Sequence, residues 1–214
     1  MKIAIFGTVG AGKSTLIEHL NRLLPEKYEV FWEPLSDNPY FEDSYSPDLK
    51  VASAASYKME LLMLSNRYKQ FKESKKFENV IYDRGIMDTI IFAHCNYEDG
   101  RIDEKDWNVY REYFEIAVLP SIFEHRNAND GYDLVVYLKV SPEKSIERIT
   151  NRGIERELKV DHKFWTKLVN MYDRWHKHLE NKFPFLVVDG NIDNPEVYAQ
   201  QIVDVVNEMN SKKA

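Results

Sequence analysis

Apolar residues along this chain fall into two patterns, short β-rich runs and longer segments with helical spacing. Such runs are typical of buried strands, and apolar positions that recur every three or four residues are typical of amphipathic helices. The runs predict strands at residues 2–6, 28–32, 79–82, 132–140 and 185–190. The helical spacing predicts helices at residues 14–24, 49–72, 86–96, 103–119, 142–152, 161–181 and 196–210. Because strands that alternate with helices form parallel sheets, we expect an α/β fold with a doubly wound, five-stranded parallel sheet.

Composition fits one globular domain over residues 1–214. Hydrophobic residues make up 43% of the chain, enough for a full core, and the net charge of −6 argues against a nucleic-acid binder, which requires a basic face. Cys95 is the single cysteine, which fits a reducing compartment. No apolar run approaches the roughly 18 residues that span a bilayer, so no membrane association is expected. Since the first core strand begins at once, we expect a cytoplasmic protein without a signal peptide.

A glycine-rich loop, Gly7-Thr8-Val9-Gly10-Ala11-Gly12-Lys13-Ser14, lies between the first predicted strand and the first predicted helix. Its glycines, lysine and serine have the spacing of a phosphate-binding loop. Glycine lets successive N–H groups curl around phosphate oxygens, and the helix N-terminus adds unpaired N–H groups and a positive dipole end. We therefore expect residues 7–15, up to and including Thr15, to bind a nucleoside triphosphate. Lys13 would reach the β- and γ-phosphates, and the Ser14 hydroxyl would ligate Mg²⁺.

Charged residues follow the second and third predicted strands, at the edge where open α/β sheets bind ligands. Glu33 precedes Pro34, which favours an extended residue at the end of the strand, although an ordinary turn would fit this spacing equally well. Asp83 and Arg84 follow the third strand, where such a pair is either a structural ion pair or a site that holds Mg²⁺ and neutralises phosphate charge. Residues 38–48 should form a short helical turn and a loop over this edge.

Two groups of charges lie on predicted helices. Glu60 and Arg67 share one face of the helix at 49–72, which is more often a solvated face than a pocket lining. A second charged run lies just past the fourth strand, where a lid in a mononucleotide-binding fold supplies arginines to phosphates. We therefore expect a lid at about 148–160 that carries Arg148, Arg152, Arg156 and Glu157. Separately, the helix at 103–119 should stop near Pro120, because proline ends helices.

With these residues placed, the chain resembles the deoxyribonucleoside kinase family over almost its whole length, and its bacterial and mycoplasmal deoxyadenosine kinase type in particular. The resemblance is carried by residues 7–14, Glu33-Pro34 with Asn38-Pro39-Tyr40-Phe41, Asp83-Arg84, 148–157 and 183–189. It implies a P-loop kinase that phosphorylates the 5′-hydroxyl of a deoxyribonucleoside with ATP and Mg²⁺, with deoxyadenosine as the leading substrate. It also implies a homodimer, for which the aromatic-rich helix near Trp165 is a candidate interface.

The resemblance implies a role for each residue that matches the family pattern. Glu33 resembles the general base, Arg84 the arginine that steadies this base and the transferring phosphoryl group, and Asp83 an acid that helps hold Mg²⁺. With Glu33 and Arg84, Lys13 completes the expected catalytic set. Arg148 and Arg152 resemble the arginines that clamp the phosphates. The residues expected to bind the nucleoside are Tyr45 and Glu157 at the sugar 3′-hydroxyl, and Glu60, Arg67, Asp88 and Phe92 at the base.

The chain also departs from the family pattern. The usual Arg-Gly-Arg of the lid reads Arg152-Gly153-Ile154, so one guanidinium is missing and Arg156 is its candidate replacement. Glu60 stands where the family has a base-reading glutamine. An ionised carboxylate only accepts hydrogen bonds, which suits the amino groups of adenine and cytosine. A shift of one residue would put Thr89 in the place of Asp88, so base specificity stays open.

Two other classes of nucleotide-binding protein share part of this pattern. A thymidylate-type monophosphate kinase shares the loop and the lid, but it must bind a second phosphate and would carry an arginine where Glu33 stands. A GTP-binding switch protein usually carries an Asn/Thr-Lys-x-Asp motif after a late strand. Residues 139–142 and 187–190 do not fit that motif. The sequence therefore favours the nucleoside kinase.

Overall fold

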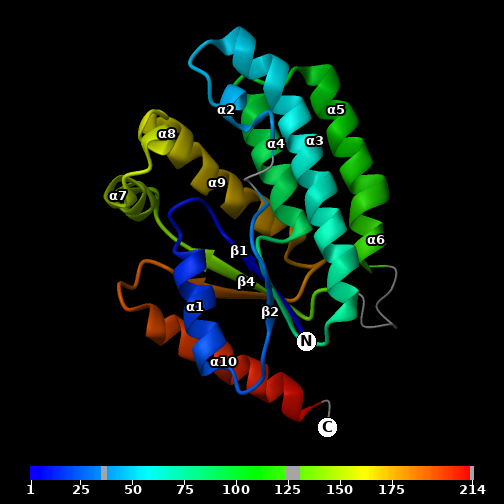
Figure 1. The fold of residues 1–214 in the computed structure, drawn as a ribbon, viewed down its shortest axis with the longest axis vertical. Helices are drawn as coiled ribbons and strands as arrows, with labels where there is room; N and C mark the ends of the chain where they lie inside the picture. Colours follow the sequence, from blue (N-terminus) through cyan, green and yellow to red (C-terminus); the bar gives the residue numbers. More distant parts are fainter. Residues whose placement is uncertain (35–37, 124–130, 213–214) are drawn as a thin grey trace.

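Five parallel strands form one sheet, in the order β2-β3-β1-β4-β5 (Figure 1). The computed structural model describes residues 1–34, 38–123 and 131–212. The strands are β1 (Lys2–Phe6), β2 (Glu29–Phe31), β3 (Val80–Asp83), β4 (Leu134–Lys139) and β5 (Phe185–Asp189), and each neighbouring pair is parallel. The chain leaves the central β1 toward β3 and β2 on one side and toward β4 and β5 on the other. Such a reversal opens a crevice at the carboxyl end of the central strand.

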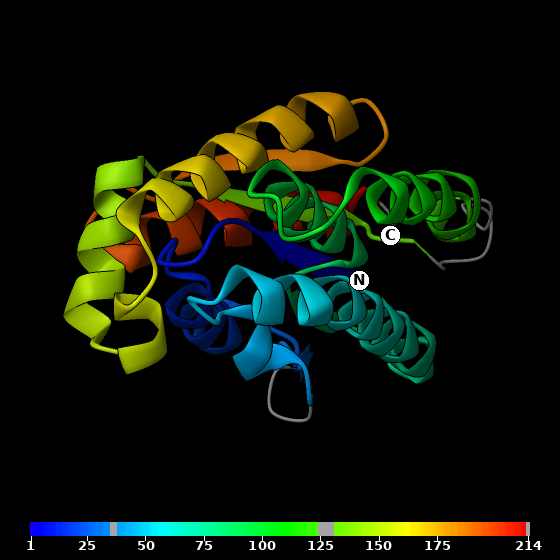
Figure 2. The same ribbon diagram turned by 90° about the horizontal axis from the view of Figure 1, so that it is seen from above.

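Helices cover both faces of the sheet, which confirms the doubly wound α/β fold (Figures 1 and 2). α1 (Lys13–Leu23) and α10 (Pro195–Ser211) pack on the face that carries Ile3 and Ile5. The opposite face, which carries Ala4 and Phe6, is covered by α3 (Leu49–Glu73), α4 (Thr89–Glu98), α5 (Glu104–Tyr113) and α9 (His162–Leu179). Successive side chains of a strand point to opposite faces, so the continuously apolar β1 must be buried on both.

Short elements lie around the carboxyl edge of the sheet. They are α2 (Phe41–Ser44), the 3-10 turn Ile86–Asp88 before α4, α7 (Pro142–Arg152) and α8 (Glu155–Leu158). The start of α7 is fixed by Ser141, whose hydroxyl accepts a hydrogen bond from the N–H of Lys144 at 3.2 Å. Its end is fixed by Gly153, which takes the left-handed conformation with φ 69°. The chain can therefore turn sharply from α7 into α8.

One helix boundary differs from the sequence prediction. The helix that begins after Asp103 does not stop near Pro120, because α5 runs on through a π-helical segment, Phe114–Val118, into α6 (Leu119–Phe123). Proline interrupts a regular α-helix because it lacks an N–H and clashes with the carbonyl four residues earlier. The wider turn just before Pro120 changes that spacing, so the proline is accommodated.

Candidate active site

The phosphate loop curls around its own lysine at the carboxyl end of β1. Gly10 and Gly12 have φ values of 74° and 96°, and a Cβ on Gly10 would lie 2.5 Å from the carbonyl oxygen of Ser145. Both positions therefore require glycine. The Lys13 ammonium is buried and donates to the Thr8 carbonyl at 2.9 Å. Burial and the nearby Arg84 lower the pKa of Lys13 to about 8, although carboxylates around it oppose the shift.

Other side chains bind further carbonyl groups of the loop. Ser145 donates to the Val9 carbonyl at 2.8 Å, Arg148 to Ala11 at 2.9 Å and Arg84 to Gly7 at 2.6 Å. Since these carbonyl oxygens are held by protein donors, the loop can present its N–H groups to an anion instead. The loop is thus preorganised for phosphate, and Gly7, Thr8 and Ala11 serve as its frame rather than as part of the cavity wall.

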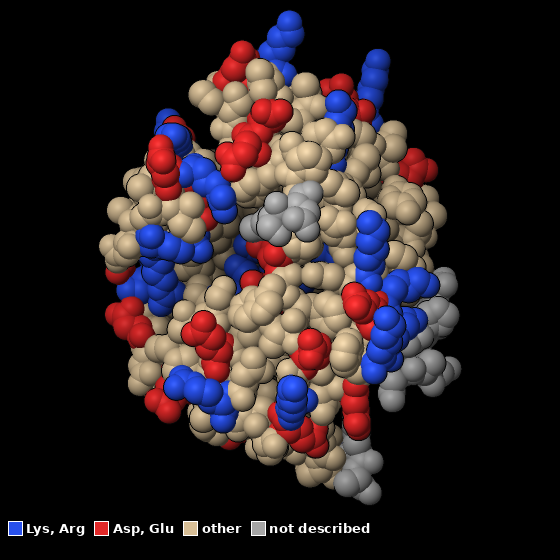
Figure 3. Space-filling model, in the orientation of Figure 1, with Lys and Arg blue, Asp and Glu red and all other residues tan. Residues whose placement is uncertain are grey.

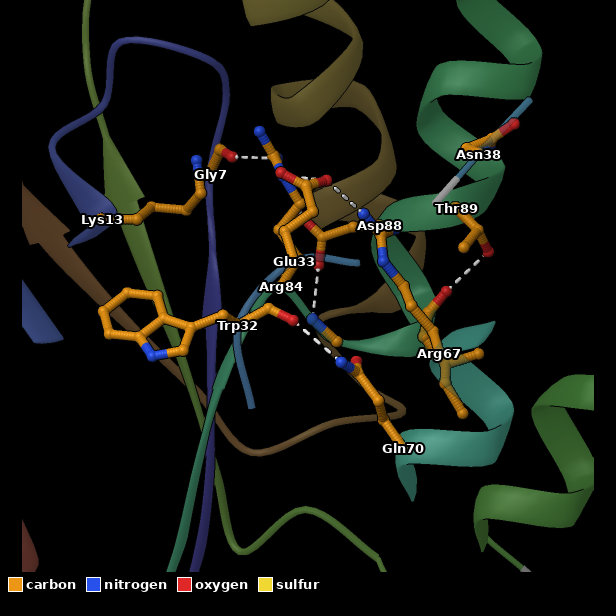
Figure 4. Close-up of polar contacts among 12 residues, drawn as sticks. Gly7, Lys13, Trp32, Glu33, Asn38, Arg67, Gln70, Arg84, Asp88 and Thr89 are labelled. Atoms are coloured by element: carbon orange, nitrogen blue, oxygen red, sulfur yellow. Dashed lines mark hydrogen bonds and ion pairs between the residues drawn. The ribbon is translucent and has the colours of Figure 1, made fainter. Parts of the chain in front are cut away.

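Glu33 lies between two arginines at the carboxyl end of β2 (Figure 4). Its Oε1 atom accepts from Arg67 Nη2 at 2.6 Å and lies 2.9 Å from Arg84 Nε. Gln70 on α3 donates to the Trp32 carbonyl at 2.8 Å, which fixes the backbone just before the carboxylate. Burial favours the neutral form of Glu33, but the positive charges of Arg84, Arg67 and Lys13 outweigh it and lower its pKa. Glu33 is therefore ionised.

Arg84 is held in an unusual backbone conformation by several partners. With φ 73°, it is the non-glycine residue with a positive φ in the described ranges 1–34, 38–123 and 131–212. Its guanidinium donates to the Tyr172 hydroxyl, lies 3.5 Å from Asp88 and sits over the Phe92 ring, 5.0 Å from the centroid. Strained backbone of this kind persists where its surroundings enforce it, and it concentrates at functional sites.

Asp88, which the family resemblance places at the base, lies 3.5 Å from the Arg84 guanidinium. Its carboxylate accepts from the Tyr172 hydroxyl at 2.8 Å and from the Gly85 N–H at 3.0 Å, and it is fully buried. Arg67 forms an ion pair with Glu33 at 2.6 Å, and its positive charge also acts on Asp88. The alternative, Thr89, is fully buried and donates to the Ile86 carbonyl at 2.7 Å (Figure 4).

A cavity of about 530 Å³ joins the phosphate loop to the region between α2, α3 and the predicted lid. Figure 3 shows a hollow with basic side chains at its rim over α7 and α8, and with charged atoms in its floor. The predicted residues that line it are Val9, Gly10, Gly12, Lys13, Ser14, Thr15, Glu33, Tyr45, Glu60, Arg67, Asp83, Arg84, Phe92, Arg148, Arg152, Arg156 and Glu157. The structure thus brings the phosphate-loop residues and the residues expected to bind the nucleoside together in one cavity.

Glu60 and Arg67 belong to this cavity, so the interpretation of a solvated helix face is wrong. Their exposed fractions are 2% and 4%. Asn96 on α4 donates from Nδ2 to Glu60 Oε1 at 2.9 Å. Burial raises the pKa of Glu60 to about 8, because Arg67 and the neutral Asn96 amide offset it only in part. This shift favours the neutral acid, whereas the sequence interpretation treated Glu60 as an ionised acceptor.

The arginines of the predicted lid have different partners. Arg148 reaches the phosphate loop, and Arg152 forms an ion pair of 2.5 Å with Glu157. Arg156 lies over the ring of Phe41, 5.0 Å from its centroid, and 4.0 Å from the Glu42 carboxylate. The predicted lid thus contacts the phosphate loop through α7 and contacts α2 through α8.

Sequence reasoning missed several cavity residues. Phe41, Met59, Met63 and Trp165 form apolar walls of the cavity. Asp193, Pro195 and Tyr198 also line it. Met59 and Met63 share a face of the helix that also carries Glu60, and this was the available signal. The sequence analysis named the helix near Trp165 only as a candidate dimer interface, whereas Trp165 is 1% exposed and lines the cavity. Asp193 and Tyr198 follow the last strand, where the sequence carried no motif.

Comparisons with known proteins agree with this geometry. A family model described as deoxynucleoside kinase matches residues 3–211. The deoxyadenosine/deoxycytidine kinase of Bacillus subtilis is 31% identical over 95% of this chain and 90% of its own length. The deoxyadenosine kinase of Dictyostelium discoideum is 30% identical over 94% of this chain and 77% of its own length.

Solved structures of the deoxyadenosine kinase from M. mycoides are also similar. The structure with bound dATP has a TM-score of 0.81 at 38% identity, and it covers 97% of this chain and 99% of that one. The structure with the products dCMP and dCDP has a TM-score of 0.79 and covers 99% of this chain. None of the helices in the described ranges is long and apolar enough to span a membrane. The chain belongs to the deoxynucleoside kinase family, as its phosphate loop, the Glu33–Arg84 pair and its arginine-bearing helices indicated.

Proposed function

We propose that this kinase transfers the γ-phosphoryl group of ATP to the 5′-hydroxyl of a deoxyribonucleoside, with deoxyadenosine as the leading substrate. The observation that carries the proposal is Glu33, an ionised carboxylate held by Arg67 and Arg84 in the same cavity as the phosphate loop. A carboxylate suits an uncharged hydroxyl acceptor, whereas it would repel the phosphate of a nucleoside monophosphate. The relatives named deoxyadenosine kinase support the choice of base.

The proposed reaction needs a general base for the hydroxyl proton and positive charges that stabilise the transferring phosphoryl group. The 5′-oxygen bonds to the γ-phosphorus, the bond from that phosphorus to the ADP oxygen breaks, and Glu33 accepts the hydroxyl proton. Phosphoryl transfer has a loose transition state, so a carboxylate with a lowered pKa is a sufficient base. Lys13 and Arg84 would stabilise the charge that spreads over the transferring oxygens.

The described residues fit a Mg²⁺ ion that arrives with the triphosphate. Asp83 Oδ1 is buried without a hydrogen-bond partner in the described part of the chain, and both Asp83 and Ser14 line the cavity. Mg²⁺ prefers oxygen ligands and keeps several waters, so few protein ligands are needed beside the phosphates. Ser14 and Asp83 would hold the ion, which would neutralise charge on the β- and γ-phosphates.

The nucleoside would lie between the acceptor-side residues. Tyr45 and Glu157 line the cavity where a sugar 3′-hydroxyl would bind, and Phe92 offers its ring to the base. Arg152, now paired with Glu157 at 2.5 Å, would turn to the phosphates together with Arg148. Asp88 would act indirectly, because its carboxylate lies 3.5 Å from the Arg84 guanidinium and helps to position it.

We also propose a cytoplasmic homodimer. Trp165 is an unsuitable contact because it is 1% exposed. Val109, Tyr113 and Ile116 are better candidates for the interface, since they recur on one side of α5 and its π-helical extension and are 58%, 56% and 67% exposed.

Four deoxynucleosides and their monophosphates, assayed in parallel with ATP and Mg²⁺, test the proposed reaction. Product from deoxyadenosine, with little from any monophosphate, is expected. Product from a monophosphate alone would overturn the assignment of Glu33 and support the thymidylate-type alternative. Glu18→Gln, on the exposed side of α1, is a matched control for Glu33→Gln.

A further inference from the structure

We propose that Glu60 reads the substrate base as a neutral carboxylic acid positioned by Asn96, and that loss of its proton shifts the base preference from adenine and cytosine toward guanine. This inference rests on the proposed function, since it concerns the nucleoside that occupies the same cavity. It replaces the expectation that Glu60 acts as an ionised acceptor.

The geometry assigns different tasks to the two carboxyl oxygens. Asn96 is buried on α4, and its Nδ2 donates to Glu60 Oε1 at 2.9 Å. An amide N–H can meet only an acceptor, so the proton of a neutral Glu60 belongs on Oε2. Glu60 itself is 2% exposed and lines the cavity. Oε2 and the second lone pair of Oε1 are therefore available to a base.

Burial favours the neutral form of Glu60, and the groups around it oppose this effect only in part. Arg67, on the same helix, favours the charged form, but its guanidinium is bound to Glu33 at 2.6 Å, and the charge of Glu33 acts in the opposite direction. Tyr45 from the end of α2, Tyr110 from α5 and Cys95 from α4 are uncharged, since burial raises the pKa of each. Burial dominates and raises the pKa of Glu60 to about 8.

Each protonation state matches a different base edge. A neutral acid offers a donor beside an acceptor, as the amide of glutamine does. Its O–H can donate to N1 of adenine or N3 of cytosine, and its carbonyl oxygen can accept from the adjacent amino group. An ionised carboxylate offers two acceptors, which face the ring-nitrogen lone pair of adenine unfavourably. Guanine instead presents two donors, N1–H and its amino group, which match the carboxylate.

A competition assay between deoxyadenosine and deoxyguanosine tests the inference. The ratio of their kcat/KM values is measured from about pH 6 to about pH 8.5, a range that brackets the change in Glu60 charge. Because both substrates compete for one enzyme, effects of pH on ATP binding and on chemistry cancel in the ratio. We expect the ratio to fall by at least about tenfold as pH rises.

Variants separate a role in base reading from a structural role. Glu60→Gln keeps the donor and acceptor but cannot ionise, so its ratio should not change with pH, whereas the exposed control Glu18→Gln should keep the wild-type profile. Asn96→Leu removes a donor that favours the ionised form. The midpoint of the pH profile should therefore move to higher pH in Asn96→Leu.

The outcomes are distinguishable from failure of the proposed function. If no deoxynucleoside is phosphorylated at any pH, the proposed reaction itself is wrong. If deoxynucleosides are phosphorylated but the wild-type ratio stays constant with pH, only the inference on Glu60 is overturned. The same conclusion follows if Glu60→Gln keeps the wild-type pH dependence. The wild-type profile alone decides the question if a variant does not fold.

Discussion

Replacement of Glu60 by glutamine should make the folded protein more resistant to alkaline pH. Glu60 ionises with a pKa of about 8 in the folded chain, against an ordinary value of 4.5, because it is buried. Below the ordinary value both the folded and the unfolded chain carry the proton, and no free energy is lost. As pH rises above it, the unfolded chain releases the proton first, so unfolding becomes easier until the folded chain ionises as well. Glutamine stays neutral in both states and removes this dependence.

The size of the effect follows from the separation of the two pKa values. The full separation, from 4.5 to about 8, corresponds to about 5 kcal/mol. Between about pH 5 and about pH 8.5, the stability of Glu60→Gln relative to the wild type should rise by about 4 kcal/mol. That is a large part of the roughly 5–15 kcal/mol by which a typical domain is stable. Urea denaturation followed by far-UV circular dichroism at the two pH values measures it.

The comparison uses the change with pH, so the constant effect of the substitution itself cancels. Glu18→Gln, which alters an exposed side chain of α1, should show no such change relative to the wild type. If the difference in unfolding free energy between Glu60→Gln and the wild type is the same at both pH values, Glu60 is already ionised in the folded protein. The assignment of a neutral acid in the base pocket would then be refuted.

Three further predictions concern the catalytic network. Because burial and Arg84 lower the pKa of Lys13 to about 8, ATP should bind with uptake of about one proton near pH 9. Calorimetry in two buffers of different ionisation enthalpy measures this uptake. The substitution Lys13→Arg should abolish it. Glu33→Gln should keep ATP binding but lower kcat by about 10² to 10⁴, as measured by single turnover, and near-normal turnover would remove Glu33 as the base. Tyr172→Phe removes the hydroxyl between Arg84 and Asp88, so kcat should fall by about tenfold while KM for ATP is kept; an unchanged kcat would show that this hydroxyl does not position Arg84.

The fold and the phosphate loop could be predicted because their determinants are local in the sequence. A buried parallel strand such as β4 is a continuous apolar run, and the loop at Gly7 to Ser14 fixes both its spacing and its neighbours. Glu33 and Arg84 were placed by a similar argument, since residues at the carboxyl ends of neighbouring parallel strands meet at one edge. The spatial order of the strands in the sheet does not need to be known for this argument to hold.

What could not be predicted depends on contacts between elements. The charge of Glu60 is set by its burial between α3 and α4 and by Asn96, which is 36 residues away in the sequence. The contacts of Asp88 with Arg84 and Tyr172 could not be predicted either, because they depend on the 3-10 turn before α4 and on its packing against α9. Helical spacing shows which residues share a face and cannot show what that face contacts.

The predicted lid contacts both the phosphate loop and the short helix α2. The sequence lacks the second arginine of the usual pattern, because Ile154 follows Gly153, and Arg156 was its candidate replacement. Arg156 lies over Phe41 and near Glu42 and lines the same cavity, while Arg148 binds the phosphate loop. Because Gly153 joins α7 and α8 in one segment, the predicted lid contacts the phosphate loop through α7 and α2 through α8.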